Sequence, residues 1–196
     1  MAAHFVIRSG PLNDIQRYYQ NSKGPAAANV VALLGMGGCG KTQLVLEYCR
    51  QAEDEGRFHA IFWIDASSPN TVAQSYTVIL EAITKNKVDS NDGAANIRTA
   101  LKMLSVWKNP WLLVFDNFDD PKAFENKHIR EYYPQRGRGF IIFTSRDAES
   151  KTLGSTILIS NMLENEGLEL LFLSSGYKGI RAILLMPKEL FTDRII

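Results

Sequence analysis

The segment VVALLGMGGCGKTQLVLEYC, residues 30–49, contains the densest cluster of glycines in the chain. Within it, residues 35–42 (GMGGCGKT) match the P-loop, or Walker A, pattern G-x-x-x-x-G-K-[ST]. Ordered glycine costs backbone entropy, so a cluster this dense needs a geometric reason. In this pattern the glycines let successive backbone N–H groups point at phosphate oxygens, and the following helix adds its positive end. Lys41 would reach the β- and γ-phosphates, and the Thr42 hydroxyl would bind Mg²⁺.

The residues around the loop supply the strand and the helix that this pattern requires. An apolar run, Val30–Leu34, precedes it, and Leu44, Val45 and Tyr48 follow with helical spacing. A chance match to the four constrained positions has a probability of about one per cent or less in a chain of this length. We therefore predict nucleotide binding. Cys39 is interpreted as a small residue at a variable loop position, with a redox-sensitive thiol as the alternative.

Composition narrows the class of protein. The 196 residues are 45% apolar and carry a formal net charge of +1, which predicts one domain and no attraction to nucleic acid or membranes. Cys39 and Cys49 form no metal-type pair and suit a reducing compartment. No run approaches the ~18 apolar residues of a membrane span, and the N-terminus lacks the apolar core of a secretory signal. A cytoplasmic location is expected.

Short apolar runs separated by helical patterns predict an α/β fold. Five runs are nearly continuous in hydrophobicity, as buried parallel strands are: Val30–Leu34, Ala60–Ile64, Trp111–Phe115, Gly139–Thr144 and Thr156–Ile159. One helix is expected to start at Ser68–Pro69, one to end before Asn109–Pro110, and one to run from a cap at Asn161 through Leu173. The prediction is a three-layer P-loop NTPase fold with a mostly parallel five-stranded sheet and helices on both faces.

Polar residues follow the third and fourth apolar runs, where parallel strands form a ligand-binding edge. Asp116 ends the third run and is predicted to hold Mg²⁺. Asn117 comes next, where a hydrolytic enzyme often has a carboxylate. An amide positions water but is not a base, so rapid hydrolysis is not expected. Asp119 and Asp120 are substitute candidates, although capping of the next segment is their expected role.

The fourth run is expected to bring Thr144, Ser145 and Arg146 to the same edge of the sheet. An arginine there can pair with a γ-phosphate and report whether it is present. The alternative is a surface arginine that pairs with Asp147.

Five blocks of the chain, taken in order, resemble the nucleotide-binding domain of NB-ARC proteins. These are the STAND-class switch ATPases of NOD-like receptors, plant resistance proteins and apoptosis adaptors. The blocks are GMGGCGKT, FHAIFWIDAS, WLLVFDNFDDP, GFIIFTSRD and ILISNMLENEGLELL, and they are most similar to fungal members. The resemblance implies that Lys41 and Thr42 hold phosphate and magnesium, that Asp116 is the Walker B acid, and that Arg146 is the sensor arginine. Asn117 stands at the second Walker B acid.

The same resemblance implies how an adenine nucleotide, ATP or ADP, is held together with Mg²⁺. Family members have an N-terminal motif whose valine backbone and arginine contact the adenine end. The sequence FVIR offers Val6 and Arg8, although Ile7 replaces the usual glycine and Ser9 the usual acid. The implied nucleotide-binding residues of the loop are Gly35, Gly37, Gly38, Cys39, Gly40, Lys41, Thr42 and Gln43.

Family members continue into a helical domain and a winged-helix domain that close over ADP. Residues 1–176 are expected to form the NB-ARC-like domain, and residues 177–196 an atypical tail that resembles neither of these. The tail is apolar and ends on Ile195 and Ile196, which suggests a fragment or an altered gene end. Without the closing domains we expect weaker affinity and faster exchange of nucleotide.

Three functions stay open at this point. The first is an ATP/ADP-binding signalling switch module with slow or absent hydrolysis, for which homo-oligomerisation is a family habit. The second is a P-loop kinase or another phosphoryl-transfer enzyme. It needs an arginine-bearing lid, for which Arg136 and Arg138 are candidates, although a solvated connection is their simplest interpretation. The third is a fragment that no longer binds nucleotide and associates through its apolar tail.

Overall fold

The computed structural model describes residues 6–21, 29–124 and 128–175. The chain divides into two units. One is Arg8–Asn161, which contains the sheet. The other combines residues from both ends of the chain, and its described part is Val6, Ile7 and residues 162–175 with helix α5 (Glu164–Ser175). The predicted tail, residues 177–196, lies outside the described residues.

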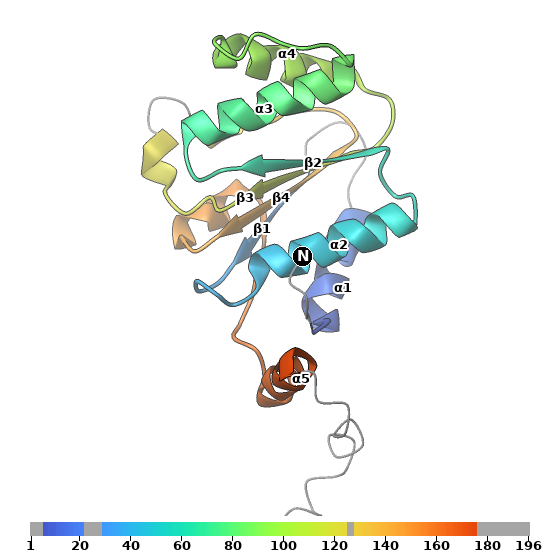
Figure 1. Ribbon diagram of the computed structural model, residues 1–196, viewed down its shortest axis with the longest axis vertical. Helices are drawn as coiled ribbons and strands as arrows, with labels where there is room; N and C mark the ends of the chain where they lie inside the picture. Colours follow the sequence, from blue (N-terminus) through green and yellow to red (C-terminus); the bar gives the residue numbers. More distant parts are fainter. Residues whose placement is uncertain (1–5, 22–28, 125–127, 176–196) are drawn as a thin grey trace, which may run out of the picture. The chain divides into compact units, whose positions relative to one another are not determined.

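The unit Arg8–Asn161 is built on one five-stranded parallel sheet (Figure 1). Its strands are β1 (Asn29–Leu34), β2 (Ala60–Asp65), β3 (Trp111–Asp116), β4 (Gly139–Ser145) and β5 (Ser155–Leu158). Their order is β2-β3-β4-β1-β5, and every neighbouring pair is parallel. The predicted α/β fold and parallel sheet are confirmed, and each strand lies within about one residue of its predicted run. The carboxyl ends of β1, β3 and β4 therefore meet at one edge.

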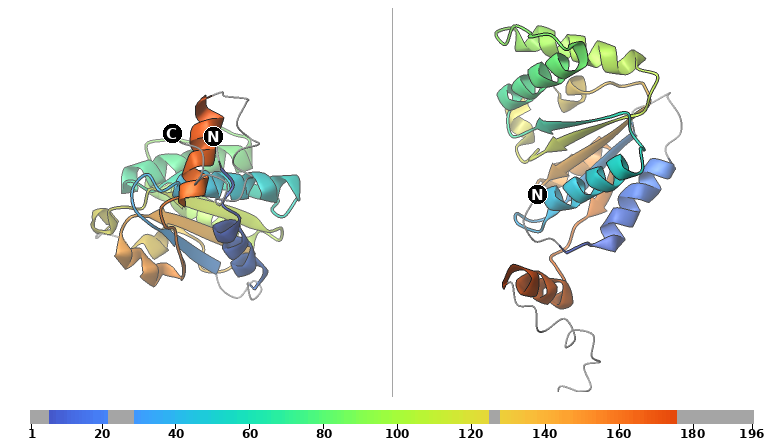
Figure 2. Two further views of the ribbon diagram at one scale, coloured as in Figure 1. Left: turned by 90° about the horizontal axis from the view of Figure 1, so that it is seen from below. Right: turned by 45° about the vertical axis from the view of Figure 1, so that its right-hand side comes forward.

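Helices cover both faces of this sheet, so the fold has three layers (Figures 1 and 2). Helices α3 (Pro69–Thr84) and α4 (Gly93–Val106) lie on one face, and α1 (Ser9–Gln20) and α2 (Lys41–Asp54) on the other. Successive residues of a strand pack against the helices on opposite faces of the sheet, because side chains along a strand alternate between the two faces. In β3, Leu113 and Phe115 belong to the α3–α4 core, whereas Leu112 and Val114 belong to the α1–α2 core. Each buried side chain of this size contributes about 1.5–3 kcal/mol.

The predicted helix boundaries are confirmed at α3 and α4 and are wrong at α5. Helix α3 begins after Ser68, whose hydroxyl accepts a hydrogen bond from the backbone N–H of Thr71 (3.2 Å). Helix α4 ends at Val106, before Asn109–Pro110. Asn161 does not cap α5: the helix begins at Glu164, and the Glu166 carboxylate accepts from the N–H of Leu163 (2.8 Å). A glutamate in the first turn that reaches back to the preceding N–H makes Leu163 the cap position.

Helix α1 and three short 3₁₀ segments have no counterpart among the predicted elements. In α1 only Leu12 and Ile15 are buried, which is too sparse a pattern to reveal the helix from the sequence. The 3₁₀ segments are η2 (Pro121–Phe124), η3 (Ile129–Tyr132) and η4 (Ala148–Leu153). Segments η2 and η3 lie in the connection from β3 to β4, and η4 lies in the connection from β4 to β5.

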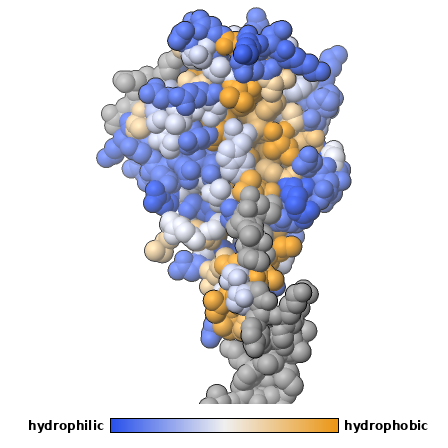
Figure 3. All heavy atoms as spheres, in the orientation of Figure 1, coloured by the Kyte–Doolittle hydropathy of each residue, from blue (hydrophilic) through white to orange (hydrophobic). Residues whose placement is uncertain are grey.

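The edge strand β2 leaves part of its apolar surface uncovered. Its residues Ile61, Phe62 and Trp63 are only partly buried, and Figure 3 shows hydrophobic side chains on this face between α3 and α2. Within the described part of the chain, no helix has both the length and the apolar character that a membrane crossing requires.

Candidate functional site

The glycine loop, residues 35–40, connects the end of β1 to the start of α2. A Cβ on Gly35 would lie 2.4 Å from the carbonyl oxygen of Ile159, so only glycine fits there. Gly40, with φ 91°, adopts the left-handed conformation that lets the chain enter α2. Among the described residues, the backbone N–H groups of Gly37, Gly38 and Gly40 donate to no protein acceptor. These donors, together with the helix N-terminus, form a site suited to an anion.

Lys41 places its charge directly beneath this loop. The side chain is only 9% exposed, and its Nζ donates to the carbonyl oxygens of Gly35 (2.8 Å) and Met36 (2.9 Å). An ammonium group has three N–H donors, so it can exchange these carbonyls for phosphate oxygens while remaining at the loop. Lys41 therefore lies at the loop, and its role in holding phosphate stays a prediction.

Thr42 and Asp116 form the centre of a hydroxyl–carboxylate network. Asp116, 5% exposed, accepts hydrogen bonds through Oδ1 from the hydroxyls of Thr42 (2.9 Å) and Thr144 (2.5 Å). Carboxylate and hydroxyl oxygens are hard ligands of the kind that Mg²⁺ prefers, and Mg²⁺ commonly takes one or two protein groups together with phosphates and waters. The pair thus fits the predicted magnesium site.

Thr144 has a role that the sequence analysis did not assign. Besides donating to Asp116, its hydroxyl accepts from the backbone N–H of Asn117 (3.0 Å), and it is 1% exposed. Strands β3 and β4 are neighbours in which Phe115 pairs with Phe143, so the residues one further along each strand also meet. A hydroxyl residue at the end of the strand beside the one that carries Asp116 is the signal that could have revealed this contact.

Asn117 lines the cavity beside the glycine loop. It is exposed and has φ 64°, a left-handed conformation that asparagine tolerates better than most residues. Its backbone is held by the hydroxyl of Thr144, which fixes where the side chain starts. An amide at this position can orient water but cannot accept its proton.

Arg146 pairs with a different acid from the one that the sequence suggested. Its Nε donates to Oδ2 of Asp119 (2.6 Å), and its backbone N–H donates to Oδ1 of the same residue (2.7 Å). The alternative partner Asp147 is therefore wrong, and so is the capping role expected for Asp119. Asp120 does cap, because its carboxylate accepts from the N–H of Ala123 (3.3 Å). Sequence proximity favoured Asp147, but the end of β3 lies closer in space.

Most predicted site residues line one cavity of about 340 Å³. Its walls are Gly37, Gly38, Gly40, Lys41, Thr42, Gln43, Asn117, Asp119 and Arg146. Gly35, Cys39 and Asp116 do not line it, but each contacts a residue that does. Gly35 and Cys39 contact Lys41, and Asp116 contacts Thr42. The cavity combines loop donors, one ammonium group, one guanidinium group and the Thr42 hydroxyl, which donates a hydrogen bond to the Asp116 carboxylate. This chemistry suits a polyphosphate with a divalent cation.

The two residues predicted to reach the adenine end are placed differently. Arg8 is buried, and its Nη1 donates to the carbonyl oxygens of Ser160 (3.1 Å) and Cys39 (3.4 Å). It therefore ties the glycine loop to the segment after β5. Val6 belongs to the other unit. Contact of either residue with adenine stays a prediction.

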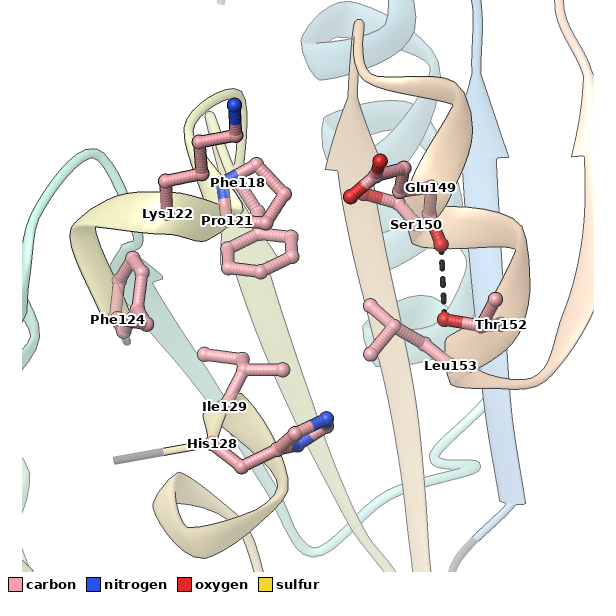
Figure 4. A pocket seen from close by; sticks show the side chains of 10 residues that line it. All are labelled: Phe118, Pro121, Lys122, Phe124, His128, Ile129, Glu149, Ser150, Thr152 and Leu153. Atoms are coloured by element: carbon pink, nitrogen blue, oxygen red, sulfur yellow. Dashed lines mark hydrogen bonds between the residues drawn. The ribbon is translucent and has the colours of Figure 1, made fainter. Parts of the chain in front are cut away.

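A second cavity, of about 420 Å³, has different chemistry (Figure 4). Its walls are Phe118, Pro121, Lys122, Phe124, His128, Ile129, Glu149, Ser150, Thr152 and Leu153. The walls are mainly apolar, and the Thr152 hydroxyl is already engaged by the carbonyl oxygen of Glu149 (2.9 Å). This cavity shares no residue with the glycine loop, and a polyphosphate suits the first cavity better.

Comparison with known proteins agrees with this geometry. An NLR-like (nucleotide-binding leucine-rich repeat) protein from Hyaloscypha variabilis is 28% identical over 76% of this chain and 16% of its own length. The Arabidopsis thaliana disease resistance RPP13-like protein 4 is 29% identical over 60% of this chain and 13% of its own length. The chain thus spans less than one fifth of either relative.

Solved structures support the fold. Cdc6p from Pyrobaculum aerophilum superposes with a TM-score of 0.59 at 12% identity, covering 86% of this chain and 49% of that protein. The family described as "NB-ARC domain" matches residues 10–176, a stretch that includes the glycine loop, Asp116 and Arg146. This chain belongs to the NB-ARC domain family.

Proposed function

We propose that the cavity at the glycine loop binds ADP and ATP together with Mg²⁺. The observation that carries the proposal is the convergence of three chain segments, after β1, β3 and β4, on one space of about 340 Å³. The first segment contributes N–H donors and an ammonium group, the second contributes Asn117 and Asp119, and the third contributes a guanidinium group.

Each residue has a specific role in this proposal. The loop N–H groups and Lys41 hold phosphate, and Thr42 and Asp116 hold Mg²⁺, which neutralises phosphate charge when bound. The terminal nitrogens of Arg146 pair with the third phosphate. At the other end of the ligand, Arg8 contacts the adenine, and the family resemblance implies the same for the backbone of Val6.

The proposed biological role is a signalling switch with slow or absent hydrolysis. Asn117 supports slow hydrolysis because an amide cannot take a proton from water. The names of the relatives, an NLR-like protein and a disease resistance protein, support a role in immune-type signalling. A cytoplasmic location is part of the proposal. Nucleotide-controlled self-association is part of this proposal, as is a domain boundary near residue 176, where the family match ends.

A phosphoryl-transfer enzyme is less well supported. Arg136 and Arg138 are exposed and precede β4, whereas Arg146 follows it, so they lie at the opposite end of that strand from the cavity. They therefore do not supply the arginine-bearing lid that a kinase would need.

The test is a titration of fluorescently labelled ADP and ATP, with and without Mg²⁺. We expect saturable binding to the unmodified chain. Binding to Lys41→Ala should be about 10- to 100-fold weaker, because the variant loses charge-assisted hydrogen bonds to phosphate. The matched control is Lys102→Ala, an exposed lysine of α4, which should bind as the unmodified chain does. Absence of binding to the unmodified chain would refute the proposal, and consumption of an added phosphoacceptor would favour a kinase.

A further inference from the structure

Asp119 uses both carboxylate oxygens on a single residue. Oδ2 accepts from the side-chain Nε of Arg146 (2.6 Å), and Oδ1 accepts from the backbone N–H of Arg146 (2.7 Å). The acid therefore fixes the start and the far part of the arginine side chain at once. The Arg146 side chain is 61% exposed and that of Asp119 22%. Ion pairs this exposed add little to fold stability, so the pair calls for another explanation.

The pairing leaves the other side of the guanidinium available. Within the described residues, Nη1 and Nη2 of Arg146 have no hydrogen-bond partner, while Nε is engaged by Asp119. The side chain also lies against the glycine loop, because a Cβ on Gly37 would be 3.4 Å from both Cδ and Nη1 of Arg146. Nη1 and Nη2 form the planar fork that binds a phosphate through two parallel hydrogen bonds. Holding Nε thus directs that fork towards the loop.

Asp119 is itself held in place by β4. The N–H of Asp119 donates to the carbonyl oxygen of Asn117 (2.8 Å), and the N–H of Asn117 donates to the hydroxyl of Thr144 (3.0 Å). The N–H of Phe118 donates to the carbonyl oxygen of Thr144 (3.0 Å). These hydrogen bonds attach the segment after β3 to Thr144, two residues before Arg146. Asp119 is therefore held close to Arg146.

We propose that Asp119 is a positioning residue that holds Arg146 over the glycine loop and thereby sets the preference of the site for ATP over ADP. The inference rests on the proposed function of the site. The third phosphate is the group that distinguishes ATP from ADP, and Arg146 is the residue predicted to meet it. An arginine that is already ordered loses less conformational entropy when it binds.

A competing effect has the opposite sign, which makes the proposal testable. Asp119 lines the cavity with the residues that bind phosphate, so its negative charge also repels the ligand. If repulsion dominated, removing Asp119 would strengthen binding, and more for ATP than for ADP because ATP carries the larger charge. If positioning dominates, removing Asp119 weakens binding of ATP and leaves that of ADP nearly unchanged.

The experiment measures the affinities of the intact chain for ADP and for a non-hydrolysable ATP analogue, with Mg²⁺. In Asp119→Ala we expect the ratio of ATP-analogue affinity to ADP affinity to fall about 3- to 10-fold, as expected for one side chain that must be ordered on binding. In Asp120→Ala, the neighbouring acid that caps η2 and does not line the cavity, the ratio should stay as it was.

Arg146→Ala and the double variant show whether the effect runs through the arginine. Arg146→Ala should lower the ratio further than Asp119→Ala, and adding Asp119→Ala to it should cause no further fall. Should Asp119→Ala unfold, as thermal melting by circular dichroism would show, Asp119→Asn takes its place. It keeps the shape and removes the charge, and it should lower the ratio in the same direction.

Two results would overturn the inference while leaving nucleotide binding intact. One is an unchanged or higher ratio in the folded Asp119 variant. The other is an equal fall on the Arg146→Ala background, which would mean that Asp119 does not act through Arg146. Failure of the unmodified chain to bind ADP is a different outcome, and it would refute the proposed function of the site as well.

Discussion

Replacing Thr144 by valine tests the network behind the glycine loop, because the change removes one hydroxyl and nearly keeps the side-chain volume. Thr144 is 1% exposed and donates to the carboxylate of Asp116 at 2.5 Å. Its hydroxyl also accepts from the N–H of Asn117 at 3.0 Å. A hydrogen bond to a charged group contributes about 1.5–3 kcal/mol, and one between neutral groups about 0.5–1.5 kcal/mol. Because water can reach the exposed Asn117 and replace part of the second bond, we expect Thr144→Val to lower the free energy of unfolding by about 2–3 kcal/mol.

The assay is urea unfolding of Thr144→Val beside Thr144→Ser, which keeps the hydroxyl and loses only a methyl group. That loss is expected to cost about 0.8 kcal/mol, so the valine variant should be the less stable of the two by at least ~1 kcal/mol. The dependence of free energy on urea concentration should be the same in both, as required for comparison of the midpoints. Thr144→Val should also reduce the gain in nucleotide affinity that Mg²⁺ provides, since Asp116 loses a donor that orients it. A valine variant as stable as the serine variant would refute the reasoning.

Two further predictions concern hydrolysis and pH. Asn117→Asp supplies the missing carboxylate at a left-handed position that aspartate also tolerates. Phosphate release from ATP should therefore rise at least ~10-fold. Unchanged release by a variant that still binds ATP would contradict the assigned role of the amide. Glu47 is buried in α2, and hydrogen bonds from Arg50, helped by one from Gln51, hold the pKa of its carboxyl below the ordinary 4.5. A lowered pKa in the folded state gives stability above pH 4.5 that is lost as the pH falls through the folded-state value. Glu47→Gln should therefore destabilise the fold by about 1 kcal/mol at pH 7, and the difference in urea midpoint should shrink as the pH falls below 4.5.

Local sequence patterns were enough to predict most elements of the fold. Continuous apolar runs predicted all five strands to within about one residue, because a parallel strand covered on both faces must be apolar throughout. The start of α3 was equally readable, since Ser68 and Pro69 act on their immediate neighbours. Helix α1 was missed because Leu12 and Ile15 are its only buried residues. Its place depends on the sheet that it covers, and no local pattern contains that information.

The candidate site also has features that the sequence predicts and features that depend on the tertiary structure. The loop GMGGCGKT, the acid Asp116 and the arginine Arg146 could be proposed from the sequence as candidates, because the loop and the acid match a phosphate and magnesium pattern and the arginine matches the family resemblance. Their mutual contacts depend on the strand order β2-β3-β4-β1-β5, which places the end of β4 between those of β1 and β3. That order decides that Arg146 pairs with Asp119, 27 residues away, and not with the adjacent Asp147. Partners of a charged side chain are selected by distance in space, and only the packed sheet determines that distance.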